Sequence, residues 1–300
     1  MNSNSQAIII LCSYLSADES RNIKPLTPSE WSKFARYLIE RKLEPKDILH
    51  FSEHDLISRL ECDKSFAERL MRLIDRSGSL QFEVNRYVEM GINIFTRADS
   101  EYPRCLKKKL GAKCPPLFYC AGDMKILSDK FAGWEGSREI NEDDKNFTHS
   151  SLMKTFAHGF NVISGGARGI DSIASETALA EGMRLVEYVS CGLLGKIKIH
   201  RIAEALRSGK MLILSAAVPN AGFNTGMAMS RNKYIYASSE FSVIIKSELN
   251  KGGTWAGAVE NLVQKWCPEL CRDVNYPGNQ ELIKRGALPI NENWDGTLPE

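Results

Sequence analysis

The sequence predicts an α/β protein: a doubly wound, mostly parallel Rossmann-like sheet preceded by a small all-helical N-terminal domain. Up to about residue 85, apolar residues recur at helical spacing and no segment has the composition of a strand. Beyond that point, short and almost continuously apolar runs alternate with single helical patterns, which is typical of parallel strands covered by helices on both faces. We therefore divide the chain into a helical domain (1–85), a Rossmann-like domain (86–290) and a loose C-terminal tail (291–300).

The N-terminal domain has a clear helix start at Thr27. Thr27 is placed as the N-cap, Pro28 follows at the first turn, and Glu30 stands three residues after the cap, which is the pattern of a capping box. Trp31 and Phe34 then begin an apolar helix face. Such a domain is either a packing or oligomerisation module or a DNA-binding helical module.

The Rossmann-like domain follows a linking helix at 82–90. Its predicted strands are 92–97, 117–122, 130–137, 161–166, 184–192, 211–217 and 241–247. The predicted helices between them are 144–158, 170–181, 197–208, one that ends near 239, and 254–266. After residue 268 we expect one more strand and a short helix.

Composition restricts the class of protein. The chain has 39 Lys and Arg against 37 Asp and Glu, a net charge of +2, so any nucleic-acid site must be a local patch. The eight cysteines include no CxxC pair and have no histidine at zinc-finger spacing, which favours free thiols in a reducing cytosol and no metal. No run is apolar enough for a signal peptide or a membrane span, so we expect a cytoplasmic protein.

The stretch at 161–180 joins an apolar strand to a glycine-rich turn and then to a helix. Such a junction binds phosphate, because glycines allow close approach and the amides at the helix start point at the anion. The glycine spacing does not fit a dinucleotide fingerprint, and no acidic residue stands at the end of the next strand to bind a ribose. Arg168 inside the turn has two interpretations: it binds a phosphate with two parallel hydrogen bonds, or it pairs with Asp171.

Three further stretches are predicted to reach the same edge of the sheet, where ligands of parallel sheets bind. They are 136–138 after the strand before the glycine turn, 231–233 near the predicted start of a helix, and 251–254 at the opening of another helix. Arg138 could also be a solvated residue after a turn. Trp255 either stacks on a base or belongs to the core.

These stretches resemble one known family. The quoted segments are GSR at 136–138, SGGARGID at 164–171, SRNKYIYASSE at 230–240, GGTWAGA at 252–258, YPGNQELIKRGA at 276–287 and Tyr102-Pro103. In their order along the chain, these segments resemble those of the DNA-processing protein A family (DprA, also Smf). That family belongs to a superfamily with nucleotide-sensing and Lonely Guy-type nucleoside-phosphate hydrolase domains.

The resemblance implies single-stranded DNA binding on an extended Rossmann fold, a homodimer, and loading of the recombinase RecA during natural transformation. A divergent member could instead work in phage defence or with mobile elements. The family's tyrosine-proline segment is absent after Cys191-Gly192, so its basic contact there is placed on Lys196 or Lys198. The residues assigned to nucleic acid and phosphate are Gly136, Ser137, Arg138, Ser164, Gly165, Gly166, Arg168, Gly169, Asp171, Lys196, Lys198, Arg231, Asn232, Lys233, Lys251, Gly252, Gly253 and Thr254.

The sequence is compatible with three functions. The first is a binding protein for single-stranded DNA without cofactor, metal or catalytic residues. The second is a sensor or N-glycosidase for a small nucleotide, because Gly252-Gly253-Thr254 followed by Glu260 looks like a loosened phosphoribohydrolase motif. The third is a structural subunit with a vestigial pocket. The five histidines form no constellation with a serine or cysteine nucleophile.

Overall fold

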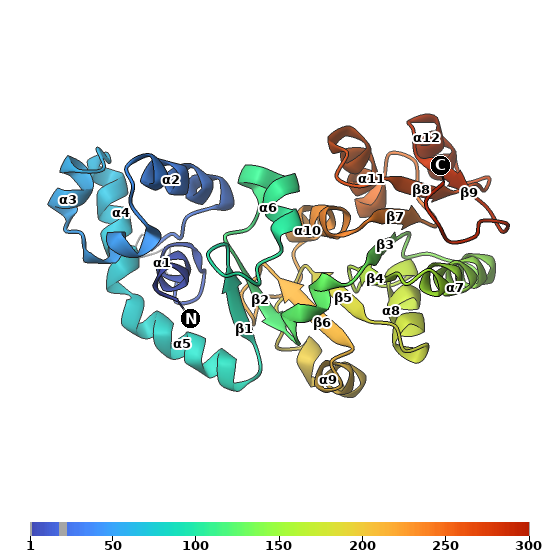
Figure 1. Cartoon of the computed structure of the whole chain (residues 1–300), viewed down its shortest axis with the longest axis horizontal. Coiled ribbons are helices and arrows are strands. Elements are labelled where there is room, and N and C mark those ends of the chain that lie inside the picture. Colours follow the sequence, from blue (N-terminus) through green and yellow to red (C-terminus); the bar gives the residue numbers. More distant parts are fainter. Residues whose placement is uncertain (1, 18–22, 300) are drawn as a thin grey trace. The chain divides into compact units, whose positions relative to one another are not determined.

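The structure is a computed structural model that describes residues 2–17 and 23–299. The chain forms two compact units: residues 1–120 with 216–219, and residues 121–215 with 220–300 (Figure 1). The helices and strands of the first unit are α1 (Ser3–Cys12), α2 (Pro28–Glu40), η2 (Pro45–His50), α3 (Glu53–Ser58), α4 (Lys64–Asp75), α5 (Ser77–Glu89), β1 (Asn93–Thr96), α6 (Arg104–Leu110), η3 (Gly111–Lys113) and β2 (Leu117–Ala121).

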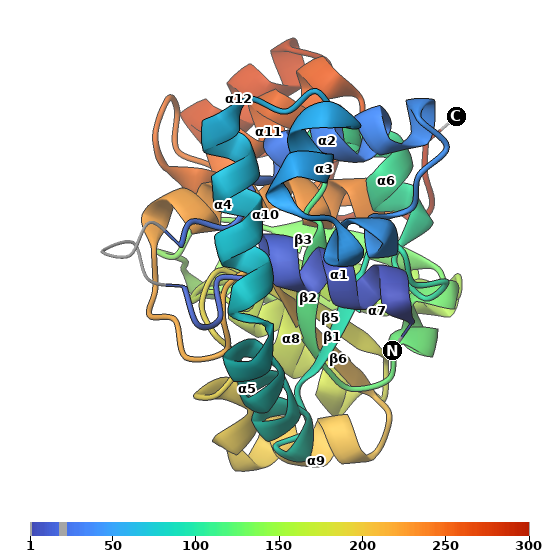
Figure 2. The same ribbon diagram turned by 90° about the vertical axis from the view of Figure 1, so that its left-hand side faces the viewer.

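The helical part of the first unit begins its second helix as predicted (Figure 2). The Thr27 hydroxyl accepts from the Glu30 amide at 3.3 Å, and the Glu30 carboxylate accepts from the Thr27 amide at 2.8 Å, so the capping box is confirmed. Arg76 is 6% exposed and donates to the carbonyl oxygens of Ile10, Ser13 and Leu15. It thereby satisfies acceptors in the last turn of α1 and beyond it that the helix itself leaves unpaired.

β1 and β2 belong to the same unit as these helices. They pair antiparallel, with Asn93 opposite Cys120. The Ser13 hydroxyl lies 2.8 Å from the Tyr119 hydroxyl, and Thr96 Oγ1 donates to Ser5 Oγ at 3.0 Å. These contacts join residues 93–120 to α1, so the first compact unit extends to residue 120. The change of sequence pattern predicts a domain boundary at residue 85 instead.

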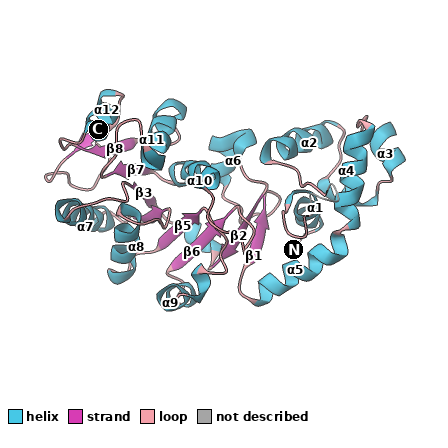
Figure 3. Ribbon diagram, turned by 180° about the vertical axis from the view of Figure 1, so that it is seen from behind, coloured by secondary structure: helices cyan, strands magenta, loops and turns pink. Residues whose placement is uncertain are grey.

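The second unit is a seven-stranded parallel sheet. Its elements are η4 (Met124–Ser128), β3 (Phe131–Glu135), α7 (Glu142–Ala157), β4 (Asn161–Ser164), α8 (Ile170–Ala180), β5 (Leu185–Val189), η5 (Lys196–Lys198), α9 (His200–Arg207), β6 (Met211–Ser215), α10 (Thr225–Ser238), β7 (Phe241–Ile244), α11 (Gly252–Gln264), β8 (Glu269–Arg272), α12 (Pro277–Lys284) and β9 (Leu288–Ile290). The strand order is β6-β5-β4-β3-β7-β8-β9, and each pair is parallel. Helices α8 and α9 cover one face and α10 and α11 the other (Figure 3), so the predicted α/β fold class is confirmed.

This topology has a switch point between β3 and β7. The chain runs from β3 through β4 and β5 to β6 on one side of β3, and then crosses back to β7 on its other side. The helices that follow β3 and β7 therefore leave in opposite directions. A crevice opens at such a point, outside the carboxyl ends of the two strands.

The end of the chain differs from the prediction of one strand and a short helix. Two strands, β8 and β9, flank α12. Trp294, in the segment expected to be a loose tail, is 8% exposed, and its ring centroid lies 6.3 Å from that of Phe241. Among the described residues, no helix is long and apolar enough to cross a membrane.

Candidate nucleic-acid interface

A cavity of about 500 Å³ occupies the switch point between β3 and β7. Glu135, the last residue of β3, pairs in register with Ile244, the last residue of β7. The segments 135–139 and 247–254, which leave these two strands, form two walls of the cavity, and α10 forms a third. Every lining residue comes from the second unit.

The glycine turn after β4 lies against this cavity, and its glycines are required by close packing. A Cβ on Gly165 would lie 1.6 Å from Arg231 Nη1. Gly169 has a φ of +83°, and a Cβ there would lie 2.2 Å from the Ser137 carbonyl oxygen. The turn is therefore packed directly on the Arg231 guanidinium and on the segment that carries Arg138.

Arg231 lies inside the site and not at a helix start, which corrects our prediction. α10 begins at Thr225, where the Asn224 side chain accepts from the Met227 amide at 3.0 Å, so Arg231 stands almost two turns into the helix. Its side chain is 9% exposed and forms an ion pair with Asp171 at 3.7 Å. Arg231 and Asp171 therefore hold α10, the glycine turn and α8 together.

Glu135 is a buried acid that the sequence analysis missed. It is 3% exposed, its Oε2 accepts from the Tyr236 hydroxyl at 3.1 Å, and its Oε1 has no partner. Burial, assisted by the nearby Asp171 carboxylate, raises the pKa of Glu135 well above its usual range, and Arg231 only partly opposes this. The raised pKa favours the protonated, neutral form of this carboxyl, which lowers the negative charge at this wall of the cavity. An acidic residue at the end of an otherwise apolar strand was the signal that could have found it.

Three exposed cations stand around the cavity and the glycine turn. The Arg138 guanidinium lies 5.8 Å from the ring centroid of Phe223, which is 61% exposed. Arg168 is exposed; Asp171 pairs with Arg231, so the alternative in which Arg168 pairs with Asp171 is not what the structure shows. Lys251 is 79% exposed and forms an ion pair with Glu248 at 3.1 Å. Such an exposed pair is weak and leaves the ammonium open to a phosphate.

Several polar residues that we assigned to phosphate binding instead connect the loops. Ser164 Oγ donates to the Trp134 carbonyl at 3.0 Å, Thr254 Oγ1 donates to the Gly136 carbonyl at 2.9 Å, and Asn232 Nδ2 donates to the Gly253 carbonyl at 3.0 Å. These bonds join β4 to β3, α11 to the end of β3, and α10 to α11. They position the backbone amides of the site.

The remaining predicted cations lie elsewhere. Lys196 donates to the Glu187 carboxylate at 3.0 Å and lines an adjoining hollow of about 280 Å³ together with Arg168. Lys198 and Lys233 line neither this hollow nor the main cavity. Trp255 is 8% exposed and belongs to a core cluster with Ile244 and Leu282, so it is a core residue and not a stacking platform.

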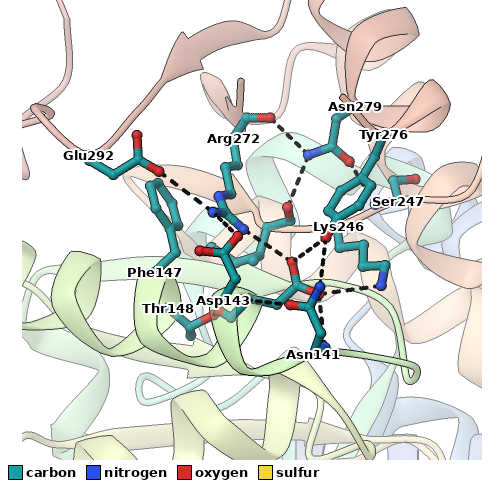
Figure 4. Close-up of polar contacts among 12 residues, drawn as sticks. Asn141, Asp143, Phe147, Thr148, Lys246, Ser247, Arg272, Tyr276, Asn279 and Glu292 are labelled. Atoms are coloured by element: carbon teal, nitrogen blue, oxygen red, sulfur yellow. Dashed lines mark hydrogen bonds and ion pairs between the residues drawn. The ribbon is translucent and has the colours of Figure 1, made fainter. Parts of the chain in front are cut away.

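A buried polar network supports the wall at 247–254 from behind (Figure 4). Arg272 at the end of β8 is 3% exposed and donates to Asp144 at 3.1 Å and to Asp143 at 2.6 Å. The Asp144 carboxylate, 0% exposed, also accepts from the Tyr276 hydroxyl at 3.0 Å and from Lys246 at 3.3 Å. The start of α7 is thereby fixed to the ends of β7 and β8.

Asn279 connects this network to the wall itself. Its Oδ1 accepts from the Ser247 amide at 2.8 Å, and its Nδ2 donates to the carbonyls of Ile245 at 3.0 Å and Arg272 at 2.9 Å. Gly278 lies so close that a Cβ there would be 2.2 Å from the Ser247 carbonyl oxygen. The segment 276–279 therefore sets the position from which the loop to Lys251 departs.

The chemistry of the site is that of anion binding. Exposed guanidinium and ammonium groups and the glycine turn surround the cavity, and Arg231 pairs with the Asp171 carboxylate beside it. Within 2–17 and 23–299, no group of three or more histidine, cysteine, aspartate or glutamate side chains is placed to hold a metal ion.

Comparison with known proteins gives the following matches. The sequence model of the family described as DNA recombination-mediator protein A matches residues 93–297. The X-ray structure of DNA processing protein A from Streptococcus pneumoniae superposes with a TM-score of 0.73 at 16% identity, covering 95% of this chain and 94% of that one. DNA processing protein A from Helicobacter pylori, whose structure concerns a single-stranded DNA binding mode, gives a TM-score of 0.54 at 23% identity over 66% of this chain and 90% of that one. No curated protein matches the sequence.

Proposed function

The chain belongs to the DNA recombination-mediator protein A family, and we propose that the cavity at the β3/β7 switch point binds single-stranded DNA through its phosphates. The structure of the Helicobacter pylori relative addresses this ligand. The proposal assigns the phosphate contacts to Arg138, Arg168 and Lys251. The glycine-turn amides supply further donors.

The observation that carries the proposal is the placement of Arg138. It is exposed at the carboxyl end of β3, it lines both the main cavity and the adjoining hollow, and its guanidinium faces the exposed ring of Phe223. A guanidinium beside an exposed aromatic ring offers one partner for a phosphate and one for a base. Binding of this kind contacts the nucleic-acid backbone and does not depend on the base sequence.

A small nucleotide is the second candidate ligand, and the cavity volume of about 500 Å³ favours it. Sites for small molecules occupy about 300–1,000 Å³. Cleavage of such a ligand is not supported, because Glu260, the acid of the loosened hydrolase motif, does not line the cavity. We therefore place the protein among binding proteins.

The wider role follows from the family as a prediction. A homodimer, a RecA-like recombinase partner and a cytoplasmic location remain predictions, as does the choice between natural transformation and phage defence. Membership of a recombination-mediator family favours a role in handling single strands during recombination.

The test is fluorescence anisotropy of a labelled oligothymidine strand titrated with the whole chain. Arg138→Glu removes a charged hydrogen-bond donor and adds a negative charge, so we expect affinity to fall about ten- to a hundredfold. Arg138→Lys retains the charge and should lose less, because a lysine cannot bind bidentately. Lys284→Glu makes the same charge change at an exposed residue outside the cavity and serves as the control.

Three further measurements separate the candidates. The wild-type affinity for the strand should fall with salt by about 0.7 log units per log unit for each phosphate neutralised. A mononucleotide that displaces the strand completely would make the small nucleotide the ligand of the cavity. Appearance of free base after incubation with nucleoside monophosphates would contradict a purely binding role.

A further inference from the structure

Helix α6 and its flanking residues carry a dense group of basic side chains. Between residues 97 and 113 the sequence has six Lys or Arg and only two Asp or Glu, in a chain whose net charge is only +2. These residues lie in the first unit, whereas the cavity lies in the second. The proposed function therefore does not use them.

Three of the cations share one face of α6. Arg104, Lys107 and Lys108 stand at positions i, i+3 and i+4, while Leu106 and Leu110 are buried. Like charges at this spacing are neighbours and destabilise a helix. Lys107 and Lys108 lie in the last turn of α6, where the helix dipole favours cations and offsets part of this repulsion.

Four of these cations form no ion pair with any described residue. In the described part of the chain, Arg97, Arg104, Lys107 and Lys108 form none of the ion pairs. Asp99 precedes α6 but accepts hydrogen bonds from other residues. Its Oδ2 accepts from the Thr96 amide at 2.7 Å, and its Oδ1 accepts from Ser5 Oγ at 2.5 Å.

Lys107 shows the electrostatic consequence. Its ammonium is half-buried, donates to the Arg97 carbonyl and lies 5.3 Å from the Tyr102 ring centroid. Burial, together with the positive charges of Arg97 and Arg104, lowers the pKa of Lys107. The group is therefore a concentration of positive charge that a ligand anion would relieve.

Hydrogen bonds join the basic segment to α2, a helix of the same unit. Arg97 Nη1 donates to Ser32 Oγ at 2.7 Å, and Ser32 Oγ donates to the Ala112 carbonyl at 3.3 Å, so α2 is joined to both ends of the basic segment. Lys33 and Arg36, which follow Ser32 in α2, are exposed.

The basic segment itself has no apolar component. No large hydrophobic side chain between residues 91 and 113 is exposed, and the nearest in α2 is Ile39, toward the end of that helix. A lipid surface or an amphipathic peptide would require exposed apolar groups. A polyanion recognised through charge alone does not, and nucleic-acid phosphates are bound in this way by Lys and Arg.

We propose that the α6 cationic face, formed by Arg97, Arg104, Lys107 and Lys108, is a second phosphate-binding surface for single-stranded nucleic acid, separate from the cavity. It rests on the proposed function only for the identity of the polyanion. It binds the backbone without reading sequence, and each cation that contacts a phosphate releases counterions.

The experiment measures the salt dependence of oligothymidine binding for four forms of the whole chain: wild type, Arg138→Glu, the double variant Arg104→Gln/Lys108→Gln, and the combination of all three changes. The matched control is Lys64→Gln/Lys284→Gln, which removes the same charge at exposed positions outside the face. The slope of log affinity against log salt should become shallower by about 1.4 in the α6 variant, because two phosphate contacts are lost at about 0.7 each. The control should keep the wild-type slope.

The outcomes separate the two proposals. If Arg138→Glu changes nothing while the α6 variant loses its slope, the cavity assignment fails and the α6 face stands. If the α6 variant and the Lys64/Lys284 control have the same slope, the α6 cations are solvated surface charges and the inference is overturned. If the α6 variant loses affinity for polyglutamate or for vesicles of anionic lipid but keeps its affinity for the strand, the inference is also overturned. Thermal unfolding of the α6 variant should occur at or above the wild-type temperature, since like-charge repulsion is relieved.

Discussion

Glu269 should make the second unit less stable as pH rises. This carboxyl lies in β8 and is 3% exposed; its Oε2 accepts from Asn261 Nδ2 at 2.9 Å, and its Oε1 has no partner. Burial raises the pKa of Glu269 from 4.5 to about 8, and the hydrogen bond from Asn261 opposes this only in part. The folded chain therefore holds a proton on Glu269 between pH 4.5 and about 8, where the unfolded chain has released it.

The magnitude follows from linkage. Since the folded state binds the extra proton, this group makes the free energy of unfolding fall as pH rises, by about 1.36 kcal/mol per pH unit. Between pH 6 and pH 8 the loss is about 2 kcal/mol, because half of the folded chains have already released the proton at pH 8, and at higher pH it levels off. Glu269→Gln has nearly the same shape and an acceptor for Asn261 but does not titrate. The variant should therefore gain about 2 kcal/mol relative to wild type over this interval.

The assay is urea unfolding of both proteins at pH 6, 7, 8 and 9, followed by tryptophan fluorescence. Titrating groups that do not interact with Glu269 contribute equally in both chains and cancel in the difference, whereas the interaction of Glu269 with Glu135 is lost in the variant. Free energies of unfolding that run parallel from pH 6 to pH 9 would refute a raised pKa at Glu269. A variant that is more stable by the same amount at every pH would indicate a packing effect instead.

Three further substitutions test the packing of the fold. Gly165→Ala places a methyl group 1.6 Å from Arg231 Nη1, so we expect a loss of about 1–3 kcal/mol in urea unfolding together with weaker strand binding; unchanged values for both would contradict the close approach. Arg272→Met removes one of the two cations that pair with the buried Asp144, Lys246 being the other, and should cost about 1.5–3 kcal/mol in urea unfolding; an unchanged free energy of unfolding would argue that Lys246 alone compensates the charge. Thr27→Ala removes the cap of α2 and should lower the stability of the first unit by about 1 kcal/mol in thermal unfolding, without changing strand binding at the cavity.

Much of the architecture can be read from local patterns. The capping box at Thr27 and the alternation of apolar runs with helices depend on neighbouring residues, which is why the helix start and the parallel α/β class were predicted correctly. The glycine turn at 164–169 was placed between a strand and a helix for the same reason. Pairing over long distances has no such local signal, so β9 was not predicted.

The start of α10 shows why one part of the site was misplaced. The segment before Arg231 contains glycine and asparagine, which favour a loop, but Asn224 acts as an N-cap and begins the helix earlier. Two turns of additional helix carry the Arg231 side chain under Gly165, where it becomes a buried partner of Asp171. A residue predicted to bind the ligand directly thus packs beneath the glycine turn and supports it.

By itself, the sequence determined the parallel α/β class, the glycine turn between a strand and a helix, and the presence of arginines near the same sheet edge, because strand periodicity and turn chemistry are local properties. Only the tertiary structure decided which cations remain available to a ligand. Burial and pairing depend on residues far apart in the chain: Asp171 binds Arg231 and leaves Arg168 exposed, while Glu187 binds Lys196. The same long-range contacts leave Arg138 at the switch point of the sheet, where a phosphate can reach it.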